Sequence, residues 1–331
     1  MQPLRIGVLG AARIVPLALL RPARDVAGVT VCALAARDPR RAQRLATSHG
    51  IARAFDSYQA LLGDPAIDAV YVPLPNGLHG RWTIAALEAG KHVLCEKPFT
   101  ANAEEADAVR KVARRTGLVC MEAFHYRYHA LTRRLLAIIA SGELGEVQRI
   151  ETSFCIPMLS FSNIRWNLGL AGGALMDAGC YTIHMLRTLA GAEPIVRSAQ
   201  AKLLKPDVDR LVRAEMEFPD GRTGSITASM LSTTLLKTSA RVIGSKATLT
   251  VFNPLAPQYF HRIRVRSATG TRTERVDRQP SSYVAQLKAF VAAVQRGDSF
   301  PTNVDDAVAN MRVIDACYKA AGLPLRQPTP S

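Results

Sequence analysis

Lys97 follows a short apolar run, His92–Cys95, in the tripeptide Glu96-Lys97-Pro98. The run predicts a strand, and doubly wound nucleotide-binding sheets bind their ligands beyond the carboxyl ends of their strands. Pro98 fixes its own φ and drives the residue before it toward extended backbone, so Lys97 is expected on a stiff turn. A lysine in such a crevice is a candidate proton donor or acceptor. The alternative is a surface lysine in an ordinary turn.

A second candidate site follows the first predicted strand, residues 4 to 10. A Gly-x-Gly-x-x-Gly turn would place glycine at positions 10, 12 and 15, but here Ala12 and Val15 occupy the last two. Alanine leaves most of the backbone approach open, and a helix N-terminus still offers N–H groups to a phosphate. The turn predicts a dinucleotide site, with a glycine turn that binds no cofactor as the alternative. The predicted contacts are Gly10, Ala12, Arg13 and Ile14.

The end of the second predicted strand favours one cofactor over another. A site selective for NAD places Asp or Glu there for the ribose 2′-hydroxyl, whereas a 2′-phosphate requires an arginine and no acid. The chain has Ala36 at that position, followed by Arg37, with Arg40 and Arg41 in the next helix. Asp38 opposes this interpretation unless it caps that helix. The sequence therefore favours NADP over NAD, with Ala36, Arg37 and Arg41 as contacts.

The length of the chain and the spacing of its cysteines limit the classes of protein that it can belong to. A chain of 331 residues predicts two domains. No apolar run is long enough for a membrane span, and the start of the chain does not match a secretory signal, so a cytoplasmic enzyme is expected. The six cysteines are scattered and include no Cys-x-x-Cys pair, which favours buried thiols over disulfides or a metal site. A reactive thiol at Cys95 or Cys180 is the alternative.

The chain is basic, with a net charge of +15 and a pI near 10. Of its 42 basic residues, 33 are arginine, and they are spread along both halves. Dispersed arginine is typical of a solvated surface. With no helix-turn-helix or aromatic-plus-basic motif, no nucleic-acid partner is expected.

The first 124 residues alternate between strand and helix patterns, which predicts an α/β Rossmann domain with a doubly wound parallel sheet. The remaining residues, 125–331, predict an α+β domain for substrate binding and oligomerisation, with a large, mostly antiparallel open sheet. Its C-terminal helices can pack back on the first domain. In the first domain we expect helices over 13–27, 40–49, 79–89 and 103–116, and strands over 4–10, 29–36, 69–73, 92–95 and 118–122. In the second we expect helices over 131–141, 178–189, 283–296 and 304–321, and strands over 146–154, 199–204, 213–218, 224–230, 238–243, 247–252 and 262–266.

Four stretches together resemble the Gfo/Idh/MocA oxidoreductase family. They are the Gly10 turn, Pro75-Asn76-Gly77-Leu78-His79, Glu96-Lys97-Pro98, and the run from Gly172 to His184. The segment 121–127 is most similar to the branch that contains trans-dihydrodiol dehydrogenase and NADP-dependent D-xylose dehydrogenase, near glucose-fructose oxidoreductase. Ala12 and His125 depart from the family pattern.

The resemblance implies roles for three catalytic residues. Oxidation of a secondary alcohol transfers hydride to the nicotinamide and a proton to a base, and Lys97 suits that base if its surroundings lower its pKa. Position 181 carries a catalytic histidine or tyrosine in the family, so Tyr181 is expected to hydrogen-bond or relay a proton with Lys97. Asp177 lies one helical turn earlier, on the same face. It is expected to bind a substrate hydroxyl or to orient Lys97.

Further contacts are expected around these three. His184 is either a substrate contact or a structural histidine, and Asn76 and His79 are either cofactor contacts or structural caps. The remaining cofactor contacts are Pro75, Glu96 and Lys97. The substrate contacts are Lys97, Arg127, Arg165, Asp177, Tyr181 and His184, with Asn163 as a further candidate.

The expected function is NADP-dependent hydride transfer to or from a sugar, cyclitol or cyclic diol. The alternative is a non-catalytic NADP-binding regulatory protein of the same fold. A homodimer or homotetramer is expected from the family pattern. The substrate and the direction of the reaction do not follow from the residues.

Overall fold

The computed structural model describes residues 2–277 and 280–330. The backbone divides into two compact units. The first comprises Met1–Arg127, Tyr283–Val308 and Pro330–Ser331, and the second Tyr128–Ser282 and Ala309–Thr329. No helix in the described part of the chain has the length and apolar character needed to cross a bilayer.

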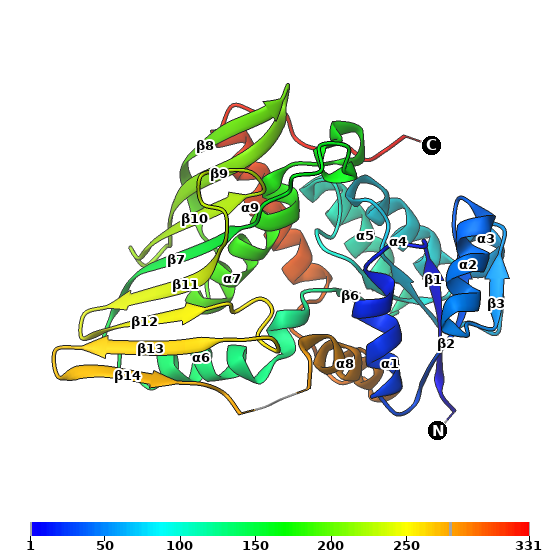
Figure 1. The fold of residues 1–331 in the computed structure, drawn as a ribbon, viewed down its shortest axis with the longest axis horizontal. Coiled ribbons are helices and arrows are strands. Elements are labelled where there is room, and N and C mark those ends of the chain that lie inside the picture. The colour runs from blue at the N-terminus through cyan, green and yellow to red at the C-terminus, as the bar shows by residue number, and fades with distance from the viewer. Residues whose placement is uncertain (1, 278–279, 331) are drawn as a thin grey trace. The chain divides into compact units, whose positions relative to one another are not determined.

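The first unit is built on a six-stranded sheet in the order β3-β2-β1-β4-β5-β6 (Figure 1). Every neighbouring pair is parallel, which confirms the predicted doubly wound sheet. The strands are β1 (Leu4–Leu9), β2 (Val29–Ala35), β3 (Arg53–Phe55), β4 (Ala69–Val72), β5 (His92–Cys95) and β6 (Cys120–Glu122).

The central strands of this sheet are apolar on both faces because helices cover them. All four residues of β4 are buried, as expected for a strand that packs on two layers. Helix α4 (His79–Glu88) packs against β4, β5 and α5 (Ala103–Thr116). Three other helices pack against β2: α1 (Arg21–Arg24), α2 (Pro39–His49) and α3 (Tyr58–Leu62). Helix α8 (Ser282–Arg296) and the short η2 (Asn76–Leu78) and η3 (His125–Tyr128) complete the elements that lie mostly in this unit.

The helix predicted over 13–27, with Pro16 and Pro22 as its exceptions, is shorter than expected and irregular. The structure has a π-helix, η1 (Pro16–Leu20), followed by the four-residue α1. Pro16 and Pro22 lack backbone N–H groups, so a regular ladder of α-helical hydrogen bonds cannot run through both positions. The short β3 and α3 were also missed, because elements of three to five residues carry too little periodicity to recognise.

The second unit contains an eight-stranded sheet in the order β14-β13-β12-β11-β7-β10-β9-β8. Strands β7 and β10 are parallel and the other neighbours antiparallel, which confirms a mostly antiparallel sheet. The strands are β7 (Val147–Cys155), β8 (Ile195–Lys205), β9 (Val208–Glu217), β10 (Thr223–Ser229), β11 (Lys237–Gly244), β12 (Ala247–Phe252), β13 (Arg262–Ser267) and β14 (Gly270–Glu274). The edge strand β14, which is polar and exposed, was not predicted.

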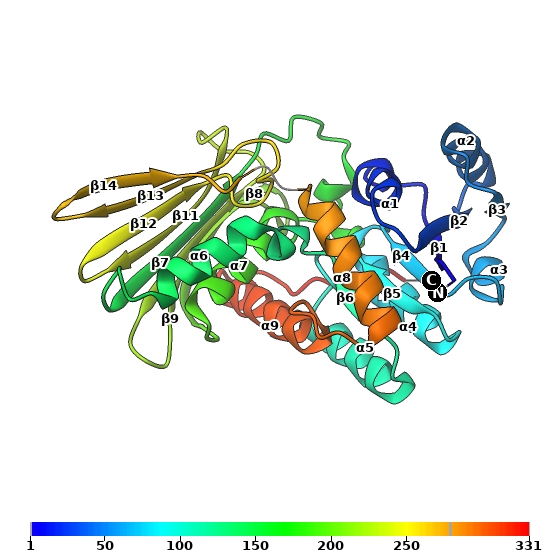
Figure 2. The ribbon, with the colours of Figure 1, turned by 90° about the horizontal axis from the view of Figure 1, so that it is seen from below.

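Helices α6 (Ala130–Ala140) and α7 (Cys180–Ala190) lie on one face of this sheet (Figure 2). The other face is polar at its centre, where Thr227, Ser153 and Ser239 are paired across β10, β7 and β11. The long helix α9 (Val304–Ala320) continues from the first unit into the second. Two short turns, η4 (Ile164–Trp166) and η5 (Leu168–Leu170), precede α7.

The predicted helix over 178–189 begins earlier and has two parts. A π-helix, η6 (Leu175–Gly179), leads directly into α7. Every residue from Leu175 to Arg187 is buried, so this is a core helix with no solvent-facing stripe. Side chains on it are therefore held by packing from all sides, which fixes their orientation.

Candidate active site

The turn after β1 needs glycine at only one of the three positions of the Gly-x-Gly-x-x-Gly pattern. Gly10 has φ of 120°, and a Cβ there would lie 3.0 Å from Leu74 Cδ2. Its N–H donates to Ala35 O at 2.7 Å, which ties the turn to the end of β2. Ala12 does not have positive φ, and Val15 is fully buried in the core. Only position 10 of the three thus requires glycine.

The charged groups at the end of β2 are compatible with a bound phosphate. Asp38 caps α2, because its side chain accepts from the Arg40 N–H at 2.9 Å. Arg41 reaches from α2 to the glycine turn, where its Nη2 donates to Ala11 O at 3.1 Å. Arg37 is exposed beside Ala36. This donor set fits the 2′-phosphate of NADP, since guanidinium groups match phosphate geometry and no acid occupies the position.

Lys97 lies where β5 ends, as the sequence predicted. It is half-buried, and its backbone N–H donates to Glu96 Oε2 at 3.4 Å. The Tyr71 hydroxyl on neighbouring β4 donates to Glu96 Oε1 at 2.6 Å. Pro75 and Asn76 lie in the corresponding turn after β4. Parallel pairing therefore brings the Gly10, Pro75 and Lys97 turns to one edge of the sheet.

His79 joins two of these turns. Its Nε2 lies 2.7 Å from Leu74 O, after β4, and its Nδ1 lies 2.7 Å from Pro98 O, after β5. Burial lowers the pKa of His79 to about 4, and the charge of Lys97 acts in the same direction. The ring is therefore neutral at pH 7. Both ring nitrogens face backbone carbonyls, so the geometry favours the structural role over direct cofactor contact.

The sequence analysis assigned no role to Glu122, at the end of β6. Its side chain is 1% exposed, and it is paired in register with Cys95 of β5. The signals for it were its place at the end of a predicted strand and within the segment 121–127 that resembles the family. Burial raises the pKa of the Cys95 thiol well above its ordinary value, and the charge of Glu122 contributes further. Cys95 is thus protonated, which argues against the alternative of a reactive thiol there.

In the second unit, Arg165 and Asp177 form an ion pair. Arg165 Nε lies 2.8 Å from Asp177 Oδ1, with the two side chains 41% and 10% exposed. Asn163 accepts from the Arg165 N–H at 3.0 Å and so caps the η4 turn that carries Arg165. The structure therefore brings two of the predicted substrate contacts together. The third candidate, Asn163, serves the local backbone.

Tyr181 lies on α7, one turn after Asp177, and is 8% exposed. Its ring meets the ring of Phe154 edge-to-face, with centroids 5.7 Å apart. Phe154 is half-buried near the end of β7, on the face that α7 covers. Sequence reasoning missed Phe154, since an aromatic residue in a strand is ordinarily core. His184 is 1% exposed, while Arg127, in the first unit, is half-buried.

The fold and these residues define a class. A parallel sheet with a glycine turn, a phosphate-compatible arginine set and a lysine at a strand end is the arrangement of a nicotinamide-dependent oxidoreductase. Residues 4–124 match the model of the oxidoreductase family with the NAD-binding Rossmann fold, and residues 132–250 match the GFO/IDH/MocA C-terminal domain. The chain belongs to the Gfo/Idh/MocA oxidoreductase family.

Several relatives are similar over nearly the whole chain. A D-xylose 1-dehydrogenase (NADP(+)) from Haloferax volcanii is 35% identical, covering 95% of this chain and 96% of its own. A dTDP-3,4-didehydro-2,6-dideoxy-alpha-D-glucose 3-reductase from Streptomyces violaceoruber is 34% identical, covering 97% and 96%. A solved 3-ketoreductase from Actinomadura kijaniata, in complex with NADP and TDP-benzene, has a TM-score of 0.89 at 28% identity, covering 96% and 98%.

The low pKa of His79 predicts a pH dependence of stability. Because its folded-state pKa, about 4, lies below the ordinary value of 6.5, the stabilisation is complete above pH 6.5 and is lost as the pH falls toward 4. This shift is equivalent to about 3 kcal/mol. We expect His79→Gln to flatten the dependence of the unfolding free energy on pH in this range, measured by urea unfolding. His49→Gln, at the end of α2, is the control. An unchanged slope in His79→Gln would contradict the assignment.

Proposed function

We propose that this protein is an NADP-dependent oxidoreductase that transfers hydride between the nicotinamide and a secondary alcohol or carbonyl of a sugar, cyclitol or cyclic diol. The observation that carries the proposal is the position of Lys97 at the strand edge that also carries the Gly10 turn and the arginines of α2. The match of both family models and the similarity to NADP-dependent sugar enzymes support it.

Each catalytic residue is proposed to act through its own chemistry. NADP, when bound, supplies or accepts the hydride. Lys97 Nζ gives or takes the proton of the reacting hydroxyl, and Glu96, fixed by Tyr71, binds polar groups beside it. Asp177, which is paired with Arg165, accepts a hydrogen bond from a substrate hydroxyl. Tyr181 donates a hydrogen bond or relays a proton.

The division of labour between parts of the chain is also a proposal. Residues 1–124 would bind the dinucleotide, and residues 125–331 would bind the substrate and form the oligomer. The extents of the two family matches support this division. All six cysteines are free thiols, which supports a reducing, cytoplasmic location.

Removal of the Lys97 amine tests the reaction. With NADP⁺ and NADPH, a panel of polyols, aldoses and ketosugars is read at the nicotinamide absorbance. We expect Lys97→Met to lower turnover by about 10²-fold or more while the Kd for NADPH changes by only a few fold. Lys111→Met, at an exposed position of α5, is the matched control. Full turnover in Lys97→Met would overturn the assignment. NADPH binding without turnover of any carbohydrate by the wild type would favour a regulatory protein.

Replacement of Arg37 tests the cofactor. Loss of a charge-assisted contact to the 2′-phosphate costs about 1.5–3 kcal/mol, so Arg37→Ala should raise the Kd for NADP by roughly 10- to 100-fold and leave NAD unchanged. Arg44→Ala, also exposed on α2, is the control. Isothermal titration with both cofactors measures the difference. Equal losses for NADP and NAD would show that Arg37 does not contact the 2′-phosphate.

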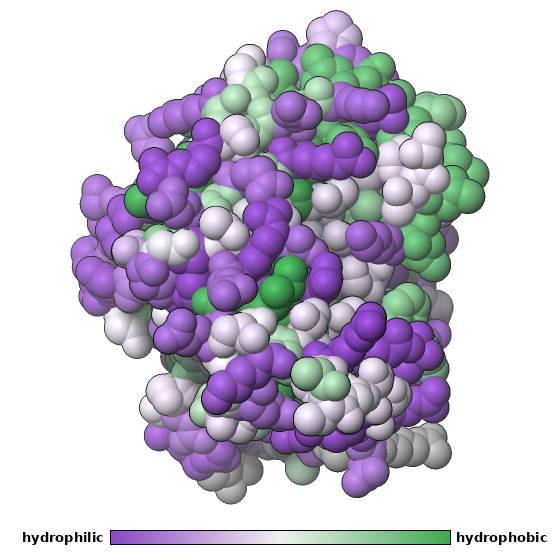
Figure 3. Space-filling model, turned by 90° about the vertical axis from the view of Figure 1, so that its left-hand side faces the viewer, coloured by the Kyte–Doolittle hydropathy of each residue, from purple (hydrophilic) through white to green (hydrophobic). Residues whose placement is uncertain are grey.

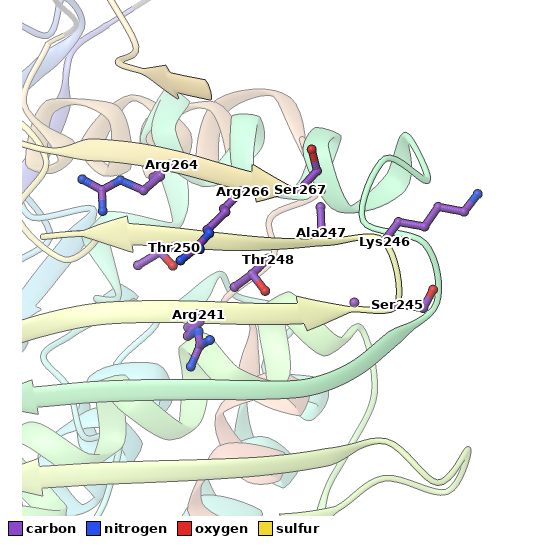
Figure 4. Close-up of a pocket in the computed structure, with 10 residues that line it drawn as sticks. Arg241, Ser245, Lys246, Ala247, Thr248, Thr250, Arg264, Arg266 and Ser267 are labelled. Atoms are coloured by element: carbon purple, nitrogen blue, oxygen red, sulfur yellow. The ribbon is translucent and has the colours of Figure 1, made fainter. Parts of the chain in front are cut away.

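We propose in addition that the chain forms a homodimer or homotetramer through the helix-free face of the eight-stranded sheet. A hollow of about 440 Å³ on this face is lined by Arg241, Arg264 and Arg266, with Thr248 and Thr250 between them (Figure 4). Glu215, on the same face on β9, is ion-paired with Arg149. In a twofold interface the same face of both copies would meet.

The residues paired at the centre of this face, Ser153, Thr227 and Ser239, are polar. Seen from the end that lies at the left in Figure 1, the surface is mostly hydrophilic in its middle, with a hydrophobic band along its right-hand edge (Figure 3). A polar interface built on charge is weakened by salt. We expect Ser239→Arg, at the centre of the sheet, to shift the molar mass measured by light scattering to that of a monomer. Ser48→Arg, at an exposed position of α2 in the first unit, is the control. An unchanged mass in Ser239→Arg would exclude this face.

A further inference from the structure

A buried charge network lies at the start of the helix that carries Asp177 and Tyr181. Arg326 comes from the segment after α9, and Asp209 from β9. Both side chains are 0% exposed, and Arg326 Nη2 donates to Asp209 Oδ1 at 2.7 Å. The hydroxyl of Tyr318, on α9, donates to the same oxygen at 3.0 Å. We name these three residues the Arg326 network.

The Arg326 network binds the backbone on both sides of one turn. Arg326 Nε donates to Gly172 O at 2.7 Å, and Asp209 Oδ2 accepts from the Leu175 N–H at 2.6 Å. The guanidinium also lies over the Tyr318 ring, 4.1 Å from its centroid. Each buried charge thus finds its partners in the other members of the network and in this turn, as buried charges require.

Close neighbours leave no room for a side chain at either glycine of the turn, Gly172 or Gly173. Gly173 has φ of 136°, and a Cβ there would lie 2.1 Å from Asp209 Oδ1 and 2.9 Å from Arg326 Nη2. A Cβ on Gly172 would lie 2.5 Å from Arg165 O. The two glycines are therefore required by the close approach of the network on one side and of the Arg165 backbone on the other.

The same turn supports both members of the Arg165–Asp177 pair. The Gly173 N–H donates to Arg165 O at 2.9 Å, and Gly173 O accepts from the Asp177 N–H at 3.1 Å. One residue thus fixes the backbone of both partners of the ion pair. Asp177 then lies one helical turn before Tyr181 in a helix that is buried on every side.

We propose that the Arg326 network positions Asp177 and Tyr181 for the reaction, so that Arg326, from the end of the chain, is a positioning residue of the active site. The inference rests on the proposed function of those two residues. Displacement of a catalytic group by about 1 Å can cost as much as 10²-fold in rate. The network acts through the backbone and touches neither substrate nor cofactor.

Two variants of the network test the proposal. Arg326→Lys retains the charge but loses the planar fork that bonds Gly172 and Asp209 from two separate nitrogens. Tyr318→Phe removes only one hydroxyl and is the variant more certain to fold. We expect kcat to fall about tenfold or more in Arg326→Lys and two- to fivefold in Tyr318→Phe. The Kd for NADPH should stay within twofold in both. Thr329→Ala, which removes a hydrogen bond from the same C-terminal segment to Gly169 O, should leave kcat unchanged.

Network variants made in a second protein background distinguish a positioning role from general destabilisation of the fold. In the double variant Asp177→Asn/Tyr181→Phe, the same network substitutions should lower kcat by less than about twofold, because both groups that they misplace are already gone. Equal losses in both backgrounds, or a loss of activity that follows the loss of folded protein by circular dichroism, would overturn the proposal.

A measurement that does not depend on catalysis tests the role of the network separately from the proposed function. Hydrogen–deuterium exchange over 173–181 should increase in Arg326→Lys and Tyr318→Phe, while α6 keeps its protection. Faster exchange with an unaffected kcat would show that the turn is loosened but that the network does not position the catalytic residues. Unchanged exchange would refute the proposal directly. If the wild type turns over no substrate, the proposed function fails, whereas the effect on the turn is still measured.

Discussion

Parallel strand pairing is the constraint on which the candidate site depends. In a parallel sheet every strand ends at the same edge, so segments distant in the sequence must leave the sheet side by side. The Gly10, Pro75 and Lys97 turns meet at this edge for that reason alone. Contacts between the turns then fix their details. Gly10 N–H bonds to the end of β2, Arg41 reaches back to Ala11, and the His79 ring spans the turns after β4 and β5.

In the second unit, the candidate residues are held in place by burial and by a buried charge network. Its candidate residues lie on a helix that is buried on all sides, and the turn that starts this helix is bonded to buried charges. Burial raises the pKa of Asp209, and Arg326 opposes that shift. Burial and the charge of Asp209 raise the pKa of the Tyr318 hydroxyl, which keeps it protonated as a donor. A network of this kind is stable only when complete, so it specifies one geometry for the turn.

The sequence predicted the features that depend on local patterns of residues. The α/β alternation, the Lys97 turn, the acid-free end of β2 and the mostly antiparallel second sheet could all be predicted, because periodicity and strand-end chemistry are local. The alternative that Asp38 caps a helix is confirmed by its bond to Arg40. The helix expected over 13–27 is shorter and irregular because Pro16 and Pro22 interrupt regular α-helical hydrogen bonding. Phe154, Glu122 and Arg326 were missed because their importance comes from neighbours that are far away in the sequence.

The sequence by itself determined the class of fold, the order of the elements and the residue types available for hydride-transfer chemistry, since these follow from local patterns. Only the tertiary structure decided how those residues are held. His79 bridges two turns, Arg165 pairs with Asp177, and an arginine near the end of the chain bonds to a glycine 154 positions earlier. Such pairings bring together segments whose separation in the sequence carries no information about contact. They are selected by the need to satisfy every buried polar group once the core has packed.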